Sequence, residues 1–168
     1  SEAPIYIDDT PNISPLELRA KCRRLQAEVD IKFIIIDYMQ LLRSSKKKVE
    51  SRYQEVSEIV REVKAFAKES KLPILALSQL SRDIEKRQDK RPLLSDLRES
   101  GEIEQTADLI MFLHRPEDYE AADDFSNIDL IIAKHRNGPT GAINLGFRKH
   151  ISTFVSVSKK VEAAPSVA

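Results

Sequence analysis

The feature of this sequence most able to do chemistry is an apolar run that ends in an acid. Residues 33–42 read FIIIDYMQLL, so that Asp37 directly follows Phe and Ile residues. A continuous apolar run is typical of a strand buried on both faces, and open α/β sheets bind ligands at the carboxyl ends of such strands. A carboxylate there can help to hold Mg²⁺ on a nucleotide, which is the role of a Walker B acid. The alternative is an aspartate that only caps a loop.

A second polar position follows the next apolar run. The segment Ile74–Leu77 is expected to be a strand, and it delivers Ser78 and Gln79 to the same sheet edge as Asp37. A neutral amide at that edge can donate to a γ-phosphate oxygen or position water, and it loses this partner on hydrolysis. Gln79 is therefore a candidate phosphate sensor, and the alternative is a polar residue that closes a strand.

Two further segments carry cations close to glycine. The stretch Ser81–Gly101 has mixed charge and ends in SDLRESG, whose arginine, main-chain N–H groups and glycine could grip phosphates without reading bases. No base-stacking aromatic lies between Ser81 and Glu104, which favours backbone tracking. In IIAKHRNGPTG, strand alternation places Lys134 and Arg136 on one face. The alternative for both segments is exposed, solubilising charge.

The segments that must position these residues alternate between the apolar spacing of strands and that of helices. The sequence predicts an α/β fold with a parallel sheet flanked by helices and extended by antiparallel C-terminal hairpins. A capping-box pattern at Ser14 and Glu17 predicts the start of the first helix. Helices are expected at 15–29 and 51–70, and strands at 5–7, 32–37, 74–77, 108–113, 128–133, 142–147 and 154–157.

Length and composition are typical of one intracellular α/β domain or of part of one. The chain has 168 residues with 27 Lys+Arg and 27 Asp+Glu, so net charge gives no indication of nucleic-acid binding. The single cysteine excludes an internal disulfide framework, and Cys22 lies in helical phase with Leu18 and Leu25, which predicts a core thiol. No apolar run is long enough to cross a bilayer and no signal-peptide pattern is present, so a cytoplasmic location without membrane contact is expected.

Taken together, IDYMQLL, the segment from Leu72 to Tyr119 with SDLRESG, and IIAKHRNGP closely resemble the C-terminal motor domain of DnaB-type bacterial replicative helicases. This resemblance implies a RecA-like P-loop NTPase core. One departure is that the family's nucleotide-cradling loop, G-x-x-x-x-G-K-[ST], does not occur in this sequence. We therefore expect residues 1–160 to be a partial motor domain that runs from Walker B to the arginine finger and begins after the Walker A segment, with 161–168 as a disordered tail.

The resemblance also implies roles for individual residues. Asp37 would hold Mg²⁺ through water, and Gln79 would respond to the ATP γ-phosphate. Lys134 and Arg136 would be finger residues that reach the ATP of a neighbouring subunit. The pore loop that tracks single-stranded DNA would contain Arg98 as charge partner, with Glu99 and Gly101 contributing main chain.

By the same resemblance, the expected protein is a homo-hexameric ATP-dependent DNA helicase that translocates on single-stranded DNA, opens the replication fork and meets a primase and a helicase loader. The chain by itself is expected to be inactive, because Walker A and the catalytic glutamate are missing from it. Two alternatives stay open at this stage. One is a non-catalytic module that retains DNA-binding and oligomerisation surfaces, and the other is a relative of RecA-class recombinases.

Overall fold

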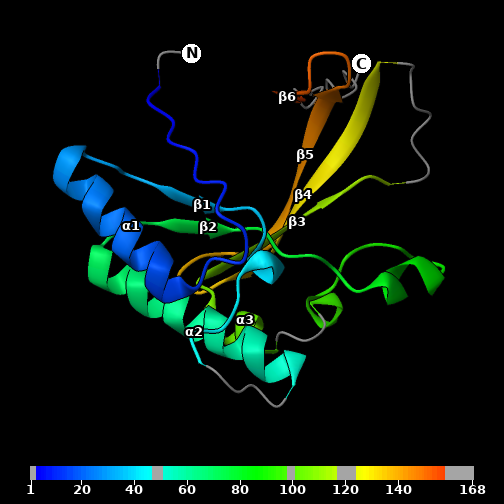
Figure 1. Cartoon of the computed structure of the whole chain (residues 1–168). Coiled ribbons are helices and arrows are strands. Elements are labelled where there is room, and N and C mark those ends of the chain that lie inside the picture. Colours follow the sequence, from blue (N-terminus) through cyan, green and yellow to red (C-terminus); the bar gives the residue numbers. More distant parts are fainter. Residues whose placement is uncertain (1–2, 47–50, 98–100, 117–123, 158–168) are drawn as a thin grey trace, which may run out of the picture. The chain divides into compact units, whose positions relative to one another are not determined.

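The computed structural model describes residues 3–46, 51–97, 101–116 and 124–157 of the chain (Figure 1). The chain divides into two units, one formed by residues 1–86 and 93–107 and the other by residues 87–92 and 108–168. The first unit contains helices and a parallel strand pair, and the second contains an antiparallel sheet. This combination agrees with the predicted α/β class.

The first helix of unit one, α1 (Pro15–Glu28), begins with the predicted capping box. The Ser14 N–H donates to Glu17 Oε2 at 2.8 Å, and the Glu17 N–H donates to Ser14 Oγ at 3.3 Å. Both contacts satisfy N–H groups that have no partner inside the helix. Cys22 is half-buried in α1, and burial raises the pKa of its thiol. The sequence predicted a core thiol, whereas Cys22 is only half-buried and is not among the buried core residues.

The second helix, α2 (Arg52–Ser70), supplies the largest share of the described core of this unit. Ser51 caps its start, because the Ser51 hydroxyl accepts the Gln54 N–H at 3.2 Å. The helix ends at Lys71, whose φ of 56° lies in the left-handed region. Its buried positions recur at the predicted spacing of three and four residues: Val56, Ser57, Ile59, Val60, Val63 and Phe66. Figure 1 shows α1 and α2 side by side, and the two helices are in contact.

Two short strands, β1 (Ile34–Ile36) and β2 (Ile74–Ala76), pair in parallel. Their register places Ile34 opposite Ile74 and Ile36 opposite Ala76. The pairing continues past the strand ends, because the Leu77 N–H donates to the Ile36 carbonyl at 2.9 Å. Within the described residues, parallel pairing is confined to these two strands.

Two predictions about this sheet are wrong. The strand expected at 5–7 does not form: the segment pairs with no strand in the described part of the chain, and the side chains of Ile5 and Ile7 are 76% and 87% exposed. The first strand was also expected to be buried on both faces. Ile34 and Ile36 are buried, but Ile35 is 60% exposed, so only one face of β1 is covered in this chain.

Short elements lie between the longer helices and strands of unit one. Among its described residues these are three 3-10 turns and one short helix: η1 (Met39–Leu41) after β1, and η2 (Arg82–Lys86), η3 (Leu94–Asp96) and α3 (Gly101–Thr106) after β2. The helix α3 packs against α2. The segment that includes η2 and η3 is the one in which the sequence predicted a phosphate-gripping loop.

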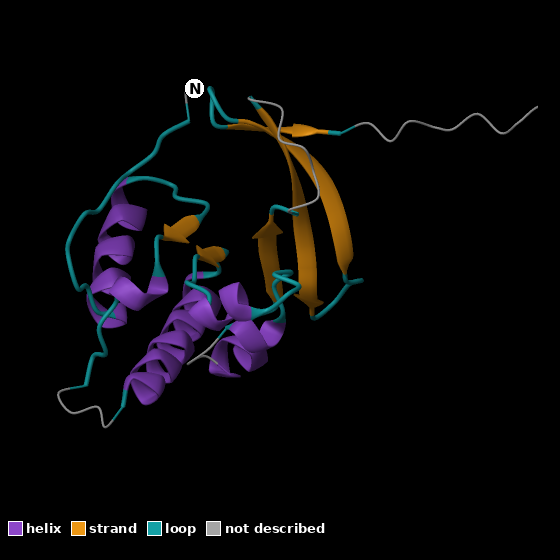
Figure 2. Ribbon diagram, turned by 90° about the vertical axis from the view of Figure 1, so that its right-hand side faces the viewer, coloured by secondary structure: helices purple, strands orange, loops and turns teal. Residues whose placement is uncertain are grey.

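In its described residues, the second unit forms a four-stranded antiparallel sheet in the order β3-β4-β5-β6. Figure 2 draws the strands in orange. Its strands are β3 (Leu109–His114), β4 (Phe125–His135), β5 (Gly141–Arg148) and β6 (Thr153–Ser156). The predicted hairpins are therefore confirmed, and β4 extends further than expected. The predicted tail at 161–168 lies outside the described residues.

Candidate functional site

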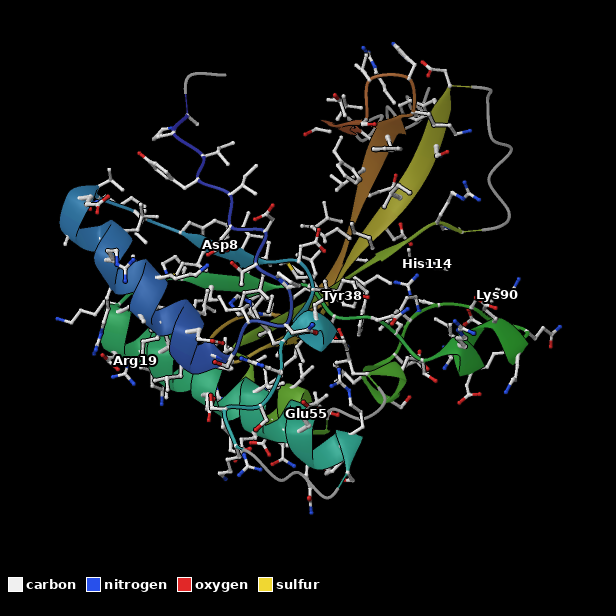
Figure 3. All side chains as sticks on the ribbon, in the orientation of Figure 1. Asp8, Arg19, Tyr38, Glu55, Lys90 and His114 are labelled. Carbon is white, nitrogen blue, oxygen red and sulfur yellow. The ribbon has the colours of Figure 1, made fainter. Side chains whose placement is uncertain are left out.

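Asp37 lies at the carboxyl end of β1, as the sequence predicted, and its side chain is exposed. Main-chain hydrogen bonds hold both sides of this position to the end of β2. The Leu77 N–H donates to the Ile36 carbonyl, and the Met39 N–H donates to the Leu77 carbonyl, both at 2.9 Å. Figure 3 labels Tyr38, the residue that follows Asp37, on this segment. The carboxylate is thus presented from a fixed main chain rather than from an unpaired loop.

Gln79 lies at the same edge as Asp37, two residues beyond the end of the parallel pairing. The contact that joins the two segments comes from Gln40, which the sequence analysis did not select. Gln40 Oε1 accepts the Gln79 N–H at 3.3 Å, and Gln40 Nε2 donates to Ser78 Oγ at 3.0 Å. The structure therefore brings together the segments of the two predicted nucleotide residues, Asp37 and Gln79.

The donor set at this edge fits a magnesium ion that is shared with a nucleotide. The carboxylate of Asp37 and the hydroxyl of Ser78 are oxygen ligands of the kind Mg²⁺ prefers. Within the described ranges, no three His, Cys, Asp or Glu side chains gather closely enough to form an all-protein metal cage. Mg²⁺ is commonly held by one or two carboxylates together with water and substrate phosphates, so a single acid is sufficient here.

The segment that leads into the predicted DNA loop is anchored by Asp96. Its buried side chain accepts the Leu93 N–H at 2.8 Å, and its carbonyl accepts the Ser81 N–H at 2.9 Å. Ser81 follows Gln79 by two residues, and Asp96 precedes Arg98 by two residues. A short connection therefore joins the candidate sensor to the start of the SDLRESG loop. Sequence reasoning missed Asp96, although a turn beginning at Leu93 with an acid three residues later is a signal for a side-chain cap.

Of the predicted DNA-contact residues, Arg98 and Glu99 lie outside the described residues. Gly101 is the first residue of α3 and is exposed. A Cβ at Gly101 would meet only the Tyr53 hydroxyl, at an ordinary contact distance of 3.5 Å. No neighbour in the described part of the chain therefore requires glycine at this position for lack of space.

In the second unit, the predicted finger residues lie where β4 turns towards β5. Lys134 is in β4, opposite Ile110 of β3, and Arg136 directly follows the end of the strand. The Arg136 N–H donates to the Asp108 carbonyl at 2.8 Å, and Arg136 Nε lies 3.1 Å from Asp108 Oδ1. Both side chains of this ion pair are at least half exposed. Asp108 therefore holds Arg136 through main chain and side chain.

His135 lies at the turn beyond β4, and its side chain is exposed. His135 Nδ1 lies 3.3 Å from the Pro139 carbonyl oxygen. A Cβ at Gly138 would overlap the present position of the His135 ring, so another residue at Gly138 would require this exposed side chain to move. The imidazole thus contacts the tip that carries Lys134 and Arg136.

Helices that could cross a lipid bilayer are absent from the part of the chain that the structure describes.

Comparison with solved structures gives the class of fold. The chain matches a DnaB-like replicative helicase solved in a study of its interactions with primase, with a TM-score of 0.81 and 41% identity over 90% of this chain and 38% of that chain. It also matches a solved ATPase domain with a TM-score of 0.78 and 41% identity over 87% of this chain and 52% of that one. The fold is therefore that of a RecA-like ATPase domain.

The family follows from sequence comparison. The model of the DnaB-like helicase C terminal domain matches residues 1–156, and the chain belongs to this family. It is 52% identical over 165 residues to the replicative DNA helicase DnaB of Geobacillus stearothermophilus and 51% identical over 165 residues to the replicative DNA helicase DnaC of Bacillus subtilis. Each alignment covers 98% of this chain and 36% of the relative, so the chain spans about a third of the length of these relatives.

Proposed function

We propose that this chain is the part of a replicative hexameric DNA helicase, from the Walker B acid to the arginine finger, that couples ATP hydrolysis to translocation on single-stranded DNA and to duplex unwinding. The observation that carries the proposal is the convergence of the Asp37 and Gln79 segments at one sheet edge, joined through Gln40, in a chain of the DnaB-like family. That edge is where open α/β sheets bind their ligands.

In this mechanism the chain's own residues position and sense a bound nucleotide. ATP with Mg²⁺ supplies the phosphoryl group and the positive charge that stabilises its transfer. Asp37 would hold the ion through water, and the Gln79 amide would donate to the γ-phosphate before hydrolysis. Loss of that acceptor on hydrolysis changes the hydrogen bonding of Gln79. The connection through Ser81 and Asp96 then carries the change towards Arg98.

Lys134 and Arg136 act on the nucleotide of a neighbouring subunit. A guanidinium group is planar and permanently charged, which suits it to offset charge that develops on a transferred phosphoryl group. Action in trans makes hydrolysis depend on ring assembly. Arg98, Glu99 and Gly101 line the central channel and follow the phosphate backbone, so translocation is indifferent to base sequence. The assembled protein works in the cytoplasm with a primase and a helicase loader.

Mixing two inactive variants of the full-length protein tests this assignment. Asp37→Asn removes Mg²⁺ binding in its own subunit, and Arg136→Ala removes the finger that serves the adjacent subunit. Each variant alone should lose ATPase activity. Mixed rings contain interfaces at which an intact Asp37 meets an intact Arg136, so part of the activity should return. If subunits exchange and no activity returns, the assignment in trans is wrong.

A further inference from the structure

Gln40 holds two successive residues of the candidate sensor segment with one side chain. The Gln79 main-chain N–H can only donate, so the group that receives it at 3.3 Å must be the Gln40 carbonyl oxygen, Oε1. That orientation points Gln40 Nε2 at Ser78 Oγ, 3.0 Å away, where it donates. A side-chain amide is the smallest neutral group that supplies both functions in a fixed plane. The partners are separated from Gln40 by 38 and 39 positions in sequence.

Gln40 is itself held in place from two directions. It is the middle residue of η1, and the preceding residue, Met39, is buried and donates its N–H to the Leu77 carbonyl. From the other side, Arg52 of α2 donates through NH2 to the Gln40 carbonyl at 2.8 Å, and its NH1 pairs with Glu55 at 2.6 Å. Figure 3 labels Glu55 on α2. The main chain of Gln40 is therefore held by the first turn of α2.

A residue that senses a phosphate must be held within a fraction of an ångström, because a hydrogen bond weakens steeply with distance and angle. Gln79 follows the end of the strand pairing, and its side chain is exposed. Its main chain therefore needs a support other than the sheet. Among the described contacts, Gln40 supplies that support, and Gln40 lies on the same segment as Asp37.

We propose that Gln40 is a positioning residue for the nucleotide sensor: it fixes the Gln79 main chain relative to the magnesium-binding segment, so that the two respond to the nucleotide as one unit. This inference rests on the proposed function, in which Gln79 contacts the γ-phosphate. It adds a role for a residue that touches neither the phosphate nor the metal ion. Gln40 is accordingly expected to affect kcat more than the KM for ATP.

The experiment compares two substitutions in the full-length, assembled protein. Gln40→Met keeps the length of the side chain and removes both hydrogen bonds. Gln40→Glu keeps an acceptor for the Gln79 N–H, and the Ser78 hydroxyl can turn to donate to the carboxylate. Gln40→Met should speed hydrogen exchange of the Gln79 amide by about fivefold or more, since a lost hydrogen bond of about 1 kcal/mol corresponds to a factor of about five. It should lower kcat by a similar factor and leave KM within about twofold.

Gln40→Glu should restore slow exchange and most of kcat. Gln26→Met makes the same change on α1, where no contact to the candidate site is present among the described residues, and it should leave both measurements unchanged. In a Gln79→Met background, adding Gln40→Met should lower kcat no further, because the two residues then act through one interaction.

The outcomes separate the two claims. Wild-type ATPase activity in Gln79→Met would overturn the sensor role in the proposed function. An inactive Gln79→Met beside a Gln40→Met variant with normal kcat would leave that function standing and overturn the inference about Gln40. If Gln40→Met does not assemble, Gln40→Glu decides: unchanged exchange and kcat support the inference, and a loss as large as that of Gln79→Met contradicts it.

Discussion

Removal of the Asp96 side chain should loosen the connection between the candidate sensor and the DNA loop. The carboxylate accepts the Leu93 N–H at 2.8 Å, and the turn it closes contains the Asp96 N–H to Leu93 carbonyl bond at 3.0 Å. The same residue's carbonyl accepts the Ser81 N–H. Asp96→Ala therefore removes the contact to the Leu93 N–H, and the turn whose main-chain bonds join Leu93, Asp96 and Ser81 loses its side-chain anchor.

The magnitude follows from the burial of the two partners. Asp96 is 7% exposed, whereas Leu93 is 51% exposed, so water can replace part of the lost contact at the Leu93 N–H. Loss of a side-chain cap typically costs about 1 kcal/mol, with a range of about 0.5–2 kcal/mol. Local opening at this turn should accordingly increase by a factor of about 5–30 for a cost of 1–2 kcal/mol.

Hydrogen exchange of individual amides measures this opening. Faster exchange is expected at Ser81, Leu93 and Asp96, while amides in the middle of α2 should stay unchanged. Asp96→Asn retains an acceptor oxygen and should show a smaller effect, and Ser95→Ala, at an exposed neighbouring position, should show none. Unchanged exchange at Ser81 in Asp96→Ala would refute the reasoning, because the side chain would then not support the main-chain contact.

Three further predictions concern charge. Hydrogen bonds from Lys21 and Thr10 lower the pKa of Asp8 to about 2. A carboxyl whose pKa is lower in the folded state stabilises the fold at pH values above its unfolded-state pKa, and this stabilisation is lost as the pH falls from about 4 towards 2. Asp8→Asn should therefore flatten that part of a plot of unfolding free energy against pH. Asp108→Ala should change the free energy of unfolding by only about 0–1 kcal/mol, as for other exposed ion pairs. It should nevertheless lower the ATPase kcat of the assembled protein, because the ion pair orients Arg136. If Asp108→Ala lowered kcat by the same factor in an Arg136→Ala background, the effect would not act through Arg136. Arg98→Ala in the full-length hexamer should weaken binding to unrelated single strands by similar factors and reduce its salt dependence, with basal ATPase retained; an unchanged salt slope would exclude Arg98 as a phosphate contact.

Local patterns predicted the elements well because their causes are local. The reciprocal contacts of Ser14 and Glu17 lie within one turn, and the buried face of α2 follows from the helical period alone. The hairpin of β4 and β5 follows from alternation and turn residues. These features follow from the period of one segment or from residues that are close in sequence at a cap or a turn, so a single sequence is enough to find them.

The contacts that organise the candidate site could not be predicted in this way. Gln40 meets Gln79 across 39 positions, and only the parallel pairing of β1 with β2 brings them together. The exposure of Ile35 and the lack of strand pairing at 5–7 were also missed. An apolar run indicates that both faces of a strand can be buried, but it does not identify the elements that would cover them. The sequence correctly placed Asp37 and Gln79 at one edge of the sheet, because that prediction required only that the two strands run in the same direction.

The two contacts between Arg136 and Asp108 have a consequence for how neighbouring subunits would meet. The main-chain hydrogen bond and the ion pair restrict the conformations of Arg136, so part of its position is set before any partner arrives. Under the proposed arrangement, a subunit that receives Lys134 and Arg136 would not have to order a loosely held loop on contact. Assembly of the ring would then lose less conformational entropy at this contact than it would with an unrestrained arginine.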